Sequence, residues 1–162
     1  MDFKETVRRI NETRNPDRVF PGTVMAFDPG ETTGVAVMTN LEMTYSCQLI
    51  TPTLFTGIHE VKKIIETHKP NMIICENYRI YGWATKQHQW AELHTPKLIG
   101  CIVCLAVLKT IPIQFQMAVE GKGWVTDQKL KTWGFYERGE KHARDAMRHA
   151  CYYLLFGDKP KK

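Results

Sequence analysis

The feature that most constrains this chain is a polar turn set between two apolar segments. Residues 23–27, Thr-Val-Met-Ala-Phe, are β-branched, aromatic or otherwise apolar and predict a buried strand, and Val35–Met38 predict the next one. The turn between them contains Asp-Pro-Gly-Glu-Thr-Thr-Gly, whose Pro-Gly pair favours a chain reversal. Asp28 therefore ends a central strand, where a buried carboxylate is costly unless it is paired or binds a cation. An Asx-type turn made by the same side chain is the alternative.

A second carboxylate follows a second apolar segment. Met72–Cys75 come directly after the turn residues Lys-Pro-Asn and predict a short buried strand, which Glu76 ends as Asp28 ends the first. Glutamate is a poor strand former and is costly to bury. Glu76 is therefore either a functional carboxylate or the solvent-exposed end of an ordinary strand.

The last predicted helix carries polar side chains along one stripe. It begins at His142 and continues to Phe156. His142, Asp145 and His149 are spaced at i, i+3 and i+7, so they project from the same side of the helix. Alanines between them keep the helix slim, which allows a close approach to a sheet. For His149 we predict a structural role, as the partner of Asp145 on the polar face of the helix.

Together, these side chains are of the type that a two-metal phosphodiester-cleaving site requires. Two divalent cations about 3.5–4 Å apart need several hard oxygen ligands that converge on one place. Such ions activate a water molecule and neutralise the leaving oxygen during in-line attack on phosphorus. The residue types and their positions thus favour metal-dependent hydrolysis of a nucleic acid.

The order of the motifs resembles that of the RuvC-type Holliday junction resolvases of the ribonuclease H-like superfamily. The resemblance rests on Asp-Pro-Gly-x-x-Thr-Gly after the first strand, Glu at the end of a middle strand, and His-x-x-Asp-Ala on a C-terminal helix. It covers the chain from about Thr23 to Phe156, and the compact form looks most like the bacteriophage branch. The resemblance implies an α/β fold with a ribonuclease H-like mixed sheet and helices on both faces.

The resemblance also assigns the site residue by residue. Asp28, Glu76 and Asp145 occupy the three carboxylate positions of these resolvases, and His142 occupies a fourth position that members fill with Asp or His. All four would be catalytic residues and ligands of two Mg²⁺ or Mn²⁺ ions per active site. The implied enzyme is an endodeoxyribonuclease of the crossover-junction type, which resolves four-way junctions and other branched DNA by paired nicks.

The same resemblance implies a homodimer, because paired nicks need two sites and this chain offers one candidate. The apolar segment Leu98–Leu108 would form part of the interface, although a helix that is apolar nearly all round can equally be ordinary core.

The remaining elements fit one nuclease domain at residues 23–156, with an N-terminal extension at 1–22 and a basic tail at 157–162. The extension contains a short amphipathic helix. Further helices are predicted at Phe55–His68, Trp90–Lys109 and Val125–Trp133, with the N-terminal one at Phe3–Glu12. Further strands are predicted at Tyr45–Ile50 and Ile111–Met117.

The composition is that of an ordinary globular protein. The chain has 162 residues, of which 43% are hydrophobic and 24% charged. The longest apolar run, Leu98–Leu108, is too short to span a bilayer, and the first residues lack the apolar core of a secretory signal. We therefore expect no membrane association and a location in the cytoplasm of a bacterial host cell. An odd number of cysteines, 5, favours reduced thiols in the core over a zinc site at Cys101 and Cys104.

The charge distribution favours a nucleic-acid partner. The net charge is +5, and residues 120–162 carry ten Lys or Arg against six Asp or Glu. Residues 78–90 mix aromatic, basic and amide side chains, which can stack on unpaired bases or bind phosphates. An alternative is that these aromatics pack on the domain or on a second subunit. The predicted DNA contacts are Arg79, Tyr81, Trp83, Lys86, Lys122 and Lys131.

Three other functions compete with a junction resolvase. An ATPase of the actin and sugar-kinase type opens with a similar Asp-x-Gly motif, but it needs a second lobe, and no Walker lysine motif is present. A non-catalytic DNA-binding relative would be expected to have lost metal positions, and all are filled here. A ribonuclease H-like nuclease with another substrate, such as a flap or an RNA–DNA hybrid, keeps the same metal site and is not separated by sequence.

Overall fold

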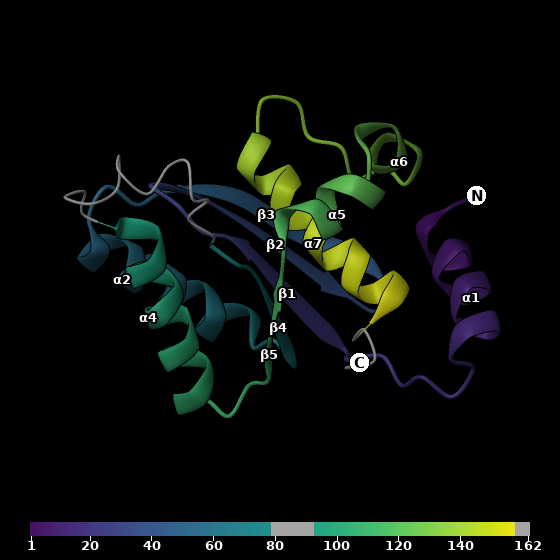
Figure 1. Cartoon of the computed structure of the whole chain (residues 1–162), viewed down its shortest axis with the longest axis horizontal. Coiled ribbons are helices and arrows are strands. Elements are labelled where there is room, and N and C mark those ends of the chain that lie inside the picture. Colours follow the sequence, from purple (N-terminus) through teal and green to yellow (C-terminus); the bar gives the residue numbers. More distant parts are fainter. Residues whose placement is uncertain (79–92, 158–162) are drawn as a thin grey trace.

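The computed structural model describes residues 1–78 and 93–157, which form a five-stranded mixed sheet with helices on both faces (Figure 1). The strand order is β3-β2-β1-β4-β5. In chain order the strands are β1 Thr23–Asp28, β2 Thr32–Thr39, β3 Glu42–Ile50, β4 Met72–Glu76 and β5 Ile113–Gln116. The first three form an antiparallel meander, whereas β4 and β5 run parallel to β1.

The parallel register brings the predicted strand ends together. Phe27 on β1 pairs with Cys75 on β4, so Asp28 and Glu76 follow on neighbouring strands at the same edge of the sheet. On the other side of β4, Glu76 pairs with Gln116, the last residue of β5. The carboxyl ends of β1, β4 and β5 therefore form one edge on which polar side chains converge.

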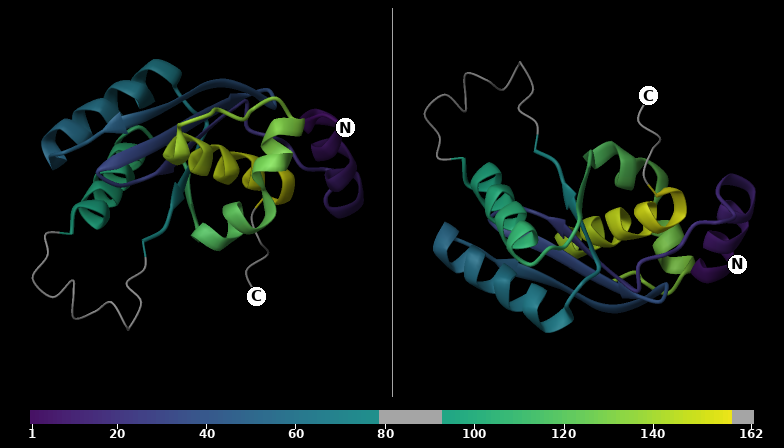
Figure 2. Two further views of the ribbon diagram at one scale, coloured as in Figure 1. Left: turned by 90° about the horizontal axis from the view of Figure 1, so that it is seen from above. Right: turned by 90° about the horizontal axis from the view of Figure 1, so that it is seen from below.

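The helices lie in two groups on opposite faces (Figure 2). Helices α2 and α4 cover one face, and α7 lies across the other, where α1, α5 and α6 pack around it. The helices are α1 Phe3–Arg14, α2 Leu54–His68, α4 His94–Leu108, α5 Ala118–Trp124, α6 Asp127–Thr132 and α7 Lys141–Phe156. No helix in the two described ranges is long and apolar enough to cross a membrane.

Side chains that point alternately to the two faces of the sheet divide the hydrophobic core into two clusters. On β1, Val24 and Ala26 pack toward α7, while Met25 and Phe27 pack toward α2 and α4. All four are fully buried, as expected for a central strand covered on both sides. The predicted N-terminal helix belongs to the α7 side, where its Phe3 and Val7 are buried in the same cluster.

The structure adds one helix to those predicted. Helix α5 contains Gly121 and Gly123, which lower helix propensity, so its sequence gave no helical signal. It is stabilised at its start by the carboxylate of Glu120, whose Oε2 accepts a hydrogen bond of 2.7 Å from the Met117 backbone N–H. The helix predicted at Val125–Trp133 is correspondingly shorter and spans Asp127–Thr132. Of the helix predicted from Trp90, residues 90–92 lie outside the described residues.

Candidate active site

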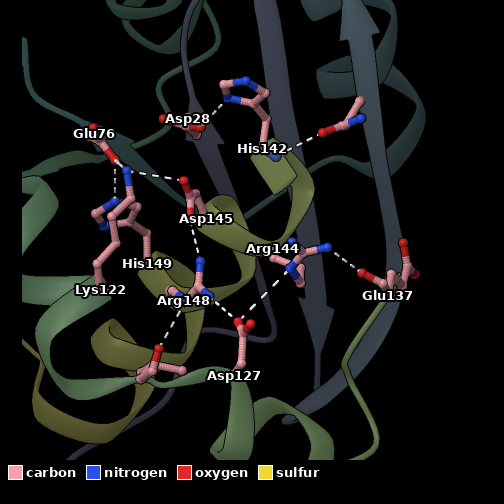
Figure 3. Close-up of polar contacts among 12 residues, drawn as sticks. Asp28, Glu76, Lys122, Asp127, Glu137, His142, Arg144, Asp145, Arg148 and His149 are labelled. Atoms are coloured by element: carbon pink, nitrogen blue, oxygen red, sulfur yellow. Dashed lines mark hydrogen bonds and ion pairs between the residues drawn. The ribbon is translucent and has the colours of Figure 1, made fainter. Parts of the chain in front are cut away.

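Asp28 and Glu76, each predicted to end a strand, reach the sheet edge from adjacent strands (Figure 3). The turn after Asp28 is closed by threonines: the hydroxyls of Thr33 and Thr51 donate to the carbonyl of Gly30 at 2.8 Å and 2.6 Å. The carboxylate of Asp28 instead contacts His142 on α7, with 2.8 Å between Oδ2 and Nδ1. The Asx-type turn is therefore not the role of Asp28 in this structure.

A glycine lets α7 approach close enough for this contact. A Cβ atom at Gly34, the last residue of the turn motif, would lie 1.9 Å from the carbonyl oxygen of His142, so only glycine fits. The backbone N–H of His142 donates to Oε1 of Gln48 on β3 at 2.8 Å. These contacts fix the first turn of α7 against β2 and β3, which places His142 beside Asp28.

Asp145 lies one turn further along α7 and is only 4% exposed. Its Oδ2 is 3.1 Å from the ammonium of Lys122, which is also 3.3 Å from Oε2 of Glu76. Lys122 thus joins the second and third predicted carboxylates (Figure 3). The sequence predicted Lys122 as a DNA contact, and the structure places it within the carboxylate cluster.

A second cation, Arg148, holds the other oxygen of Asp145. Its guanidinium donates to Oδ1 of Asp145 and to Oδ1 of Asp127, and its Nε donates to the carbonyl of Val125 at 3.0 Å. Asp127 is the first residue of α6, so this network ties Asp145 to the neighbouring helix. Arg148 was not among the predicted site residues, although its i+3 spacing from Asp145 is a recognisable signal.

His149 has a different partner from the one predicted. It is fully buried, and its Nε2 lies 2.8 Å from Oε2 of Glu76, while its Nδ1 lies 2.8 Å from Oε1 of Gln116. Asp145 instead pairs with Lys122 and Arg148. The predicted pairing of His149 with Asp145 was wrong, because Glu76 and Gln116 at the sheet edge contact both nitrogens of the imidazole.

The pKa values of Asp28 and Glu76 are shifted in opposite directions by their surroundings. Burial, followed by the negative charge of Glu76, raises the pKa of Asp28, and His142 and Lys122 offset only part of this. Burial alone would raise the pKa of Glu76 too, but His149 and Lys122 outweigh it and lower this pKa below its ordinary value. Burial lowers the pKa of Lys122, but the neighbouring carboxylates more than reverse this, so it is raised.

The cluster has the donor chemistry of a divalent-metal site. Carboxylate oxygens are the ligands that Mg²⁺ and Mn²⁺ prefer, and a cation would offset the burial and the repulsion by Glu76 that raise the pKa of Asp28. Within residues 1–78 and 93–157, however, no three His, Cys, Asp or Glu side chains are placed to hold one ion. Because Lys122 joins Glu76 and Asp145, these carboxylates can share a cation only after its ammonium moves.

Among the other predicted DNA contacts, Lys131 lies within the described residues and does not join this cluster. The ammonium of Lys131 lies over the ring of Tyr136, 4.7 Å from its centroid. Arg79, Tyr81, Trp83 and Lys86 lie outside the described residues.

The fold matches solved structures of Holliday junction resolvases. RuvC of Thermus thermophilus, in complex with a Holliday junction substrate, has a TM-score of 0.66 at 14% identity, covering 83% of this chain and 93% of that chain. The yeast mitochondrial Holliday junction resolvase Ydc2 has a TM-score of 0.60 at 12% identity, covering 95% of this chain and 85% of that chain. No protein-family profile and no curated protein sequence matches. At these identities the likeness concerns the fold, and it confirms the predicted ribonuclease H-like architecture.

Proposed function

We propose that this chain is a divalent-metal-dependent endonuclease that resolves Holliday junctions and other branched DNA by paired nicks. The observation that carries the proposal is the convergence of Asp28, Glu76 and Asp145 from two strand ends and a helix onto one edge of the sheet. Burying these carboxylates together is costly, because burial and the charge of Glu76 raise the pKa of Asp28, and a cation would offset that cost. The likeness to a resolvase solved with a Holliday junction supports the choice of substrate.

The proposed roles follow from the contacts of each side chain. Asp28, Glu76, His142 and Asp145 would hold two Mg²⁺ or Mn²⁺ ions, which supply an activated water and neutralise the leaving oxygen. His142 and Arg148 orient Asp28 and Asp145 through their hydrogen bonds. We assign Lys122, once released from the carboxylates, to a phosphate of the substrate.

The outward face of α4 supports the proposed homodimer. Val107 and Leu108 are 68% and 74% exposed at the end of this apolar helix, and Cys104 is exposed one turn earlier. Apolar side chains that gather on one exposed face are typical of an interaction surface. A second copy of the chain, related by a two-fold axis, would cover this face and supply the second active site.

The dimer is tested by charging this face. Leu108→Glu should convert a dimer, or a dimer that forms on the junction, into a monomer, without lowering thermal stability, because the side chain is exposed in the single chain. Val19→Glu is the matched control, since Val19 is 90% exposed and lies beside α1 and α7, on the opposite face of the sheet from α4. Sedimentation of the protein with and without a four-way junction gives the mass. An unchanged mass for Leu108→Glu would place the interface elsewhere.

The substrate is tested with a panel of labelled DNA. The protein is incubated with a four-way junction, a flap, a linear duplex and an RNA–DNA hybrid, in Mg²⁺, in Mn²⁺ and in excess EDTA. We expect symmetric paired nicks in the junction and no cleavage in EDTA. Preferential cutting of the flap or hybrid would make the chain a ribonuclease H-like nuclease with another substrate. Junction binding without cleavage in either metal would make it a non-catalytic relative.

A further inference from the structure

His149 is fully buried beside Glu76 in the candidate site. Its ring is fully buried, with Nε2 at 2.8 Å from Oε2 of Glu76 and Nδ1 at 2.8 Å from Oε1 of Gln116. Glu76 and Gln116 are paired residues at the ends of β4 and β5, so the imidazole bridges two strands from the helix that crosses them. Such a bridge fixes the orientation of Glu76 relative to the sheet.

The hydrogen-bond partners decide where the proton on His149 lies. Gln116 is 2% exposed, and its Nε2 has no hydrogen-bond partner within residues 1–78 and 93–157. If Oε1 of Gln116 accepts from Nδ1, the contact with the ionised Glu76 needs a second proton on Nε2. If the amide is turned so that it donates to Nδ1, a neutral ring carries its proton on Nε2. In both arrangements, therefore, His149 donates to Glu76.

Helix α5 packs against the imidazole of His149 at Gly121. A Cβ atom at Gly121 would lie 2.9 Å from Nδ1 and 3.1 Å from Cε1 of His149. These distances are shorter than an ordinary van der Waals contact, so a side chain at this position would displace the imidazole. The glycine that weakens the helical signal of α5 is thus the residue that makes room for His149.

We propose that His149 is a positioning residue that orients Glu76 for a divalent cation. Its hydrogen bond holds Oε2, which Lys122 also contacts, and so fixes the orientation of the carboxylate that would hold the ion. This inference rests on the proposed function, because Glu76 is a metal ligand only there. Partners that orient a metal ligand typically change metal affinity by about 10–100-fold when they are removed.

The test is direct Mn²⁺ binding to the full chain without DNA, measured by calorimetry and by the electron paramagnetic resonance of free Mn²⁺. His149→Leu fills the space but removes the donor, and should weaken Mn²⁺ binding by about tenfold or more. His149→Gln places an amide N–H near the former Nε2 and should restore most of the affinity. The matched control is Cys151→Ala, a buried change on the same helix that should lower thermal stability and leave Mn²⁺ affinity unchanged.

A second pair of variants distinguishes a loss of the Glu76 orientation from a general loss of stability. Gly121→Ala should displace the imidazole and weaken Mn²⁺ binding in the otherwise unchanged chain. In a His149→Leu background the same change should have little further effect on affinity, because the hydrogen bond is already lost. If His149→Leu does not fold, Gly121→Ala and His149→Gln still give the comparison. Equal Mn²⁺ affinities in all folded variants and the unchanged chain overturn the proposal.

Junction cleavage by the unchanged protein distinguishes this inference from the proposed function. If the junction is cut but Mn²⁺ affinity does not depend on His149, only the role of His149 is overturned. If Mn²⁺ binds and the variants rank as expected, yet no branched DNA is cut, the role of His149 stands and the nuclease function fails. A chain that binds no Mn²⁺ at the carboxylates overturns both.

Discussion

The two halves of the candidate site balance their negative charge in different ways. Asp28 has His142 as its side-chain hydrogen-bond partner, and its pKa is raised by burial and by the other carboxylates. Glu76 and Asp145 share Lys122, and each has a further donor of its own. The pKa of Glu76 is lowered accordingly. Among the described residues, no Lys or Arg side chain therefore contacts Asp28, whereas Lys122 and Arg148 contact the other half.

This difference follows from which elements supply the partners. The first turn of α7 reaches Asp28 with a single side chain, His142. Further along α7, Arg148 contacts Asp145 and His149 contacts Glu76, and Lys122 of α5 contacts both carboxylates. The side chains of the protein thus position Glu76 and Asp145 themselves. A bound cation would stabilise the site most at Asp28. Changing the charge of one half at a time therefore tests this contrast.

The largest effect is expected from Asp28→Asn, which keeps the shape of the side chain and removes the least compensated charge. If the carboxylate binds the catalytic metal, cleavage of a four-way junction should fall by about a thousandfold or more, while junction binding is retained. Excess EDTA should abolish cleavage by the unchanged protein. Single-turnover cleavage and gel-shift assays measure the two quantities.

The control for this change is Asp17→Asn, since Asp17 is exposed and outside the cluster. Cleavage by Asp17→Asn should match that of the unchanged protein. Full activity of Asp28→Asn would exclude the assigned metal site.

The next largest effect is expected from Lys122, which balances the negative charge of Glu76 and Asp145. Lys122→Gln removes an ammonium 3.1 Å from Asp145 and 3.3 Å from Glu76, so a divalent cation no longer competes with it. Mn²⁺ affinity in the absence of DNA should rise by about tenfold, although Lys122 is partly exposed and solvent screens its charge. Junction cleavage should fall at the same time if the ammonium binds a substrate phosphate.

Lys131→Gln is the matched control, because the ammonium of Lys131 lies over Tyr136 and outside the carboxylate cluster. Its Mn²⁺ affinity should be unchanged. An equal Mn²⁺ affinity for Lys122→Gln would mean that the ammonium does not compete with the ion.

The contrast between the halves also shows what sequence patterns can predict. Asp28 and Glu76 were predictable because each ends an apolar strand, and parallel pairing brings such ends to one edge. Asp145 and His142 were predictable because helical spacing puts them on one side of α7. These signals are local, and they identified the residues that carry the negative charge together with His142.

The compensating partners were harder to predict because they depend on tertiary contacts. The role of Lys122 requires α5, whose glycines give no helical signal. The role of His149 requires the register between β4 and β5, which sets Glu76 beside Gln116. Helical spacing alone pointed His149 toward Asp145, since spacing describes neighbours on the same helix only.

A smaller effect is expected on the free energy of unfolding in the absence of metal. Removing a carboxylate should change it in opposite directions in the two halves. Asp28→Asn removes a repelled charge and should raise the free energy of unfolding at neutral pH by about 1 kcal/mol. Glu76→Gln removes the partner of Lys122 and His149 and should lower it by about 2 kcal/mol. Urea unfolding with EDTA present measures both values.

The pH dependence follows from the two pKa shifts. Because the pKa of Asp28 is raised on folding, the folded chain gains stability from this group as the pH falls through that pKa, so the advantage of Asp28→Asn should shrink on acidification. The pKa of Glu76 is lowered, so its contribution is lost as the pH falls through the folded value, and the deficit of Glu76→Gln should shrink as well. Effects of the same sign for both variants at neutral pH would contradict the contrast.

The smallest effect is expected from His142→Asp, which turns the Asp28 half into an all-carboxylate site. A neutral imidazole is a softer ligand than a carboxylate and adds no charge, so the unchanged protein should favour Mn²⁺ over Mg²⁺ more strongly than the variant does. The ratio of cleavage rates in saturating Mn²⁺ and Mg²⁺ should fall by about three- to tenfold in His142→Asp. His59→Asp adds the same charge at an exposed histidine on α2 and should leave the ratio unchanged. Equal ratios in all three proteins would show that His142 supports Asp28 by its hydrogen bond alone and does not itself contact the metal.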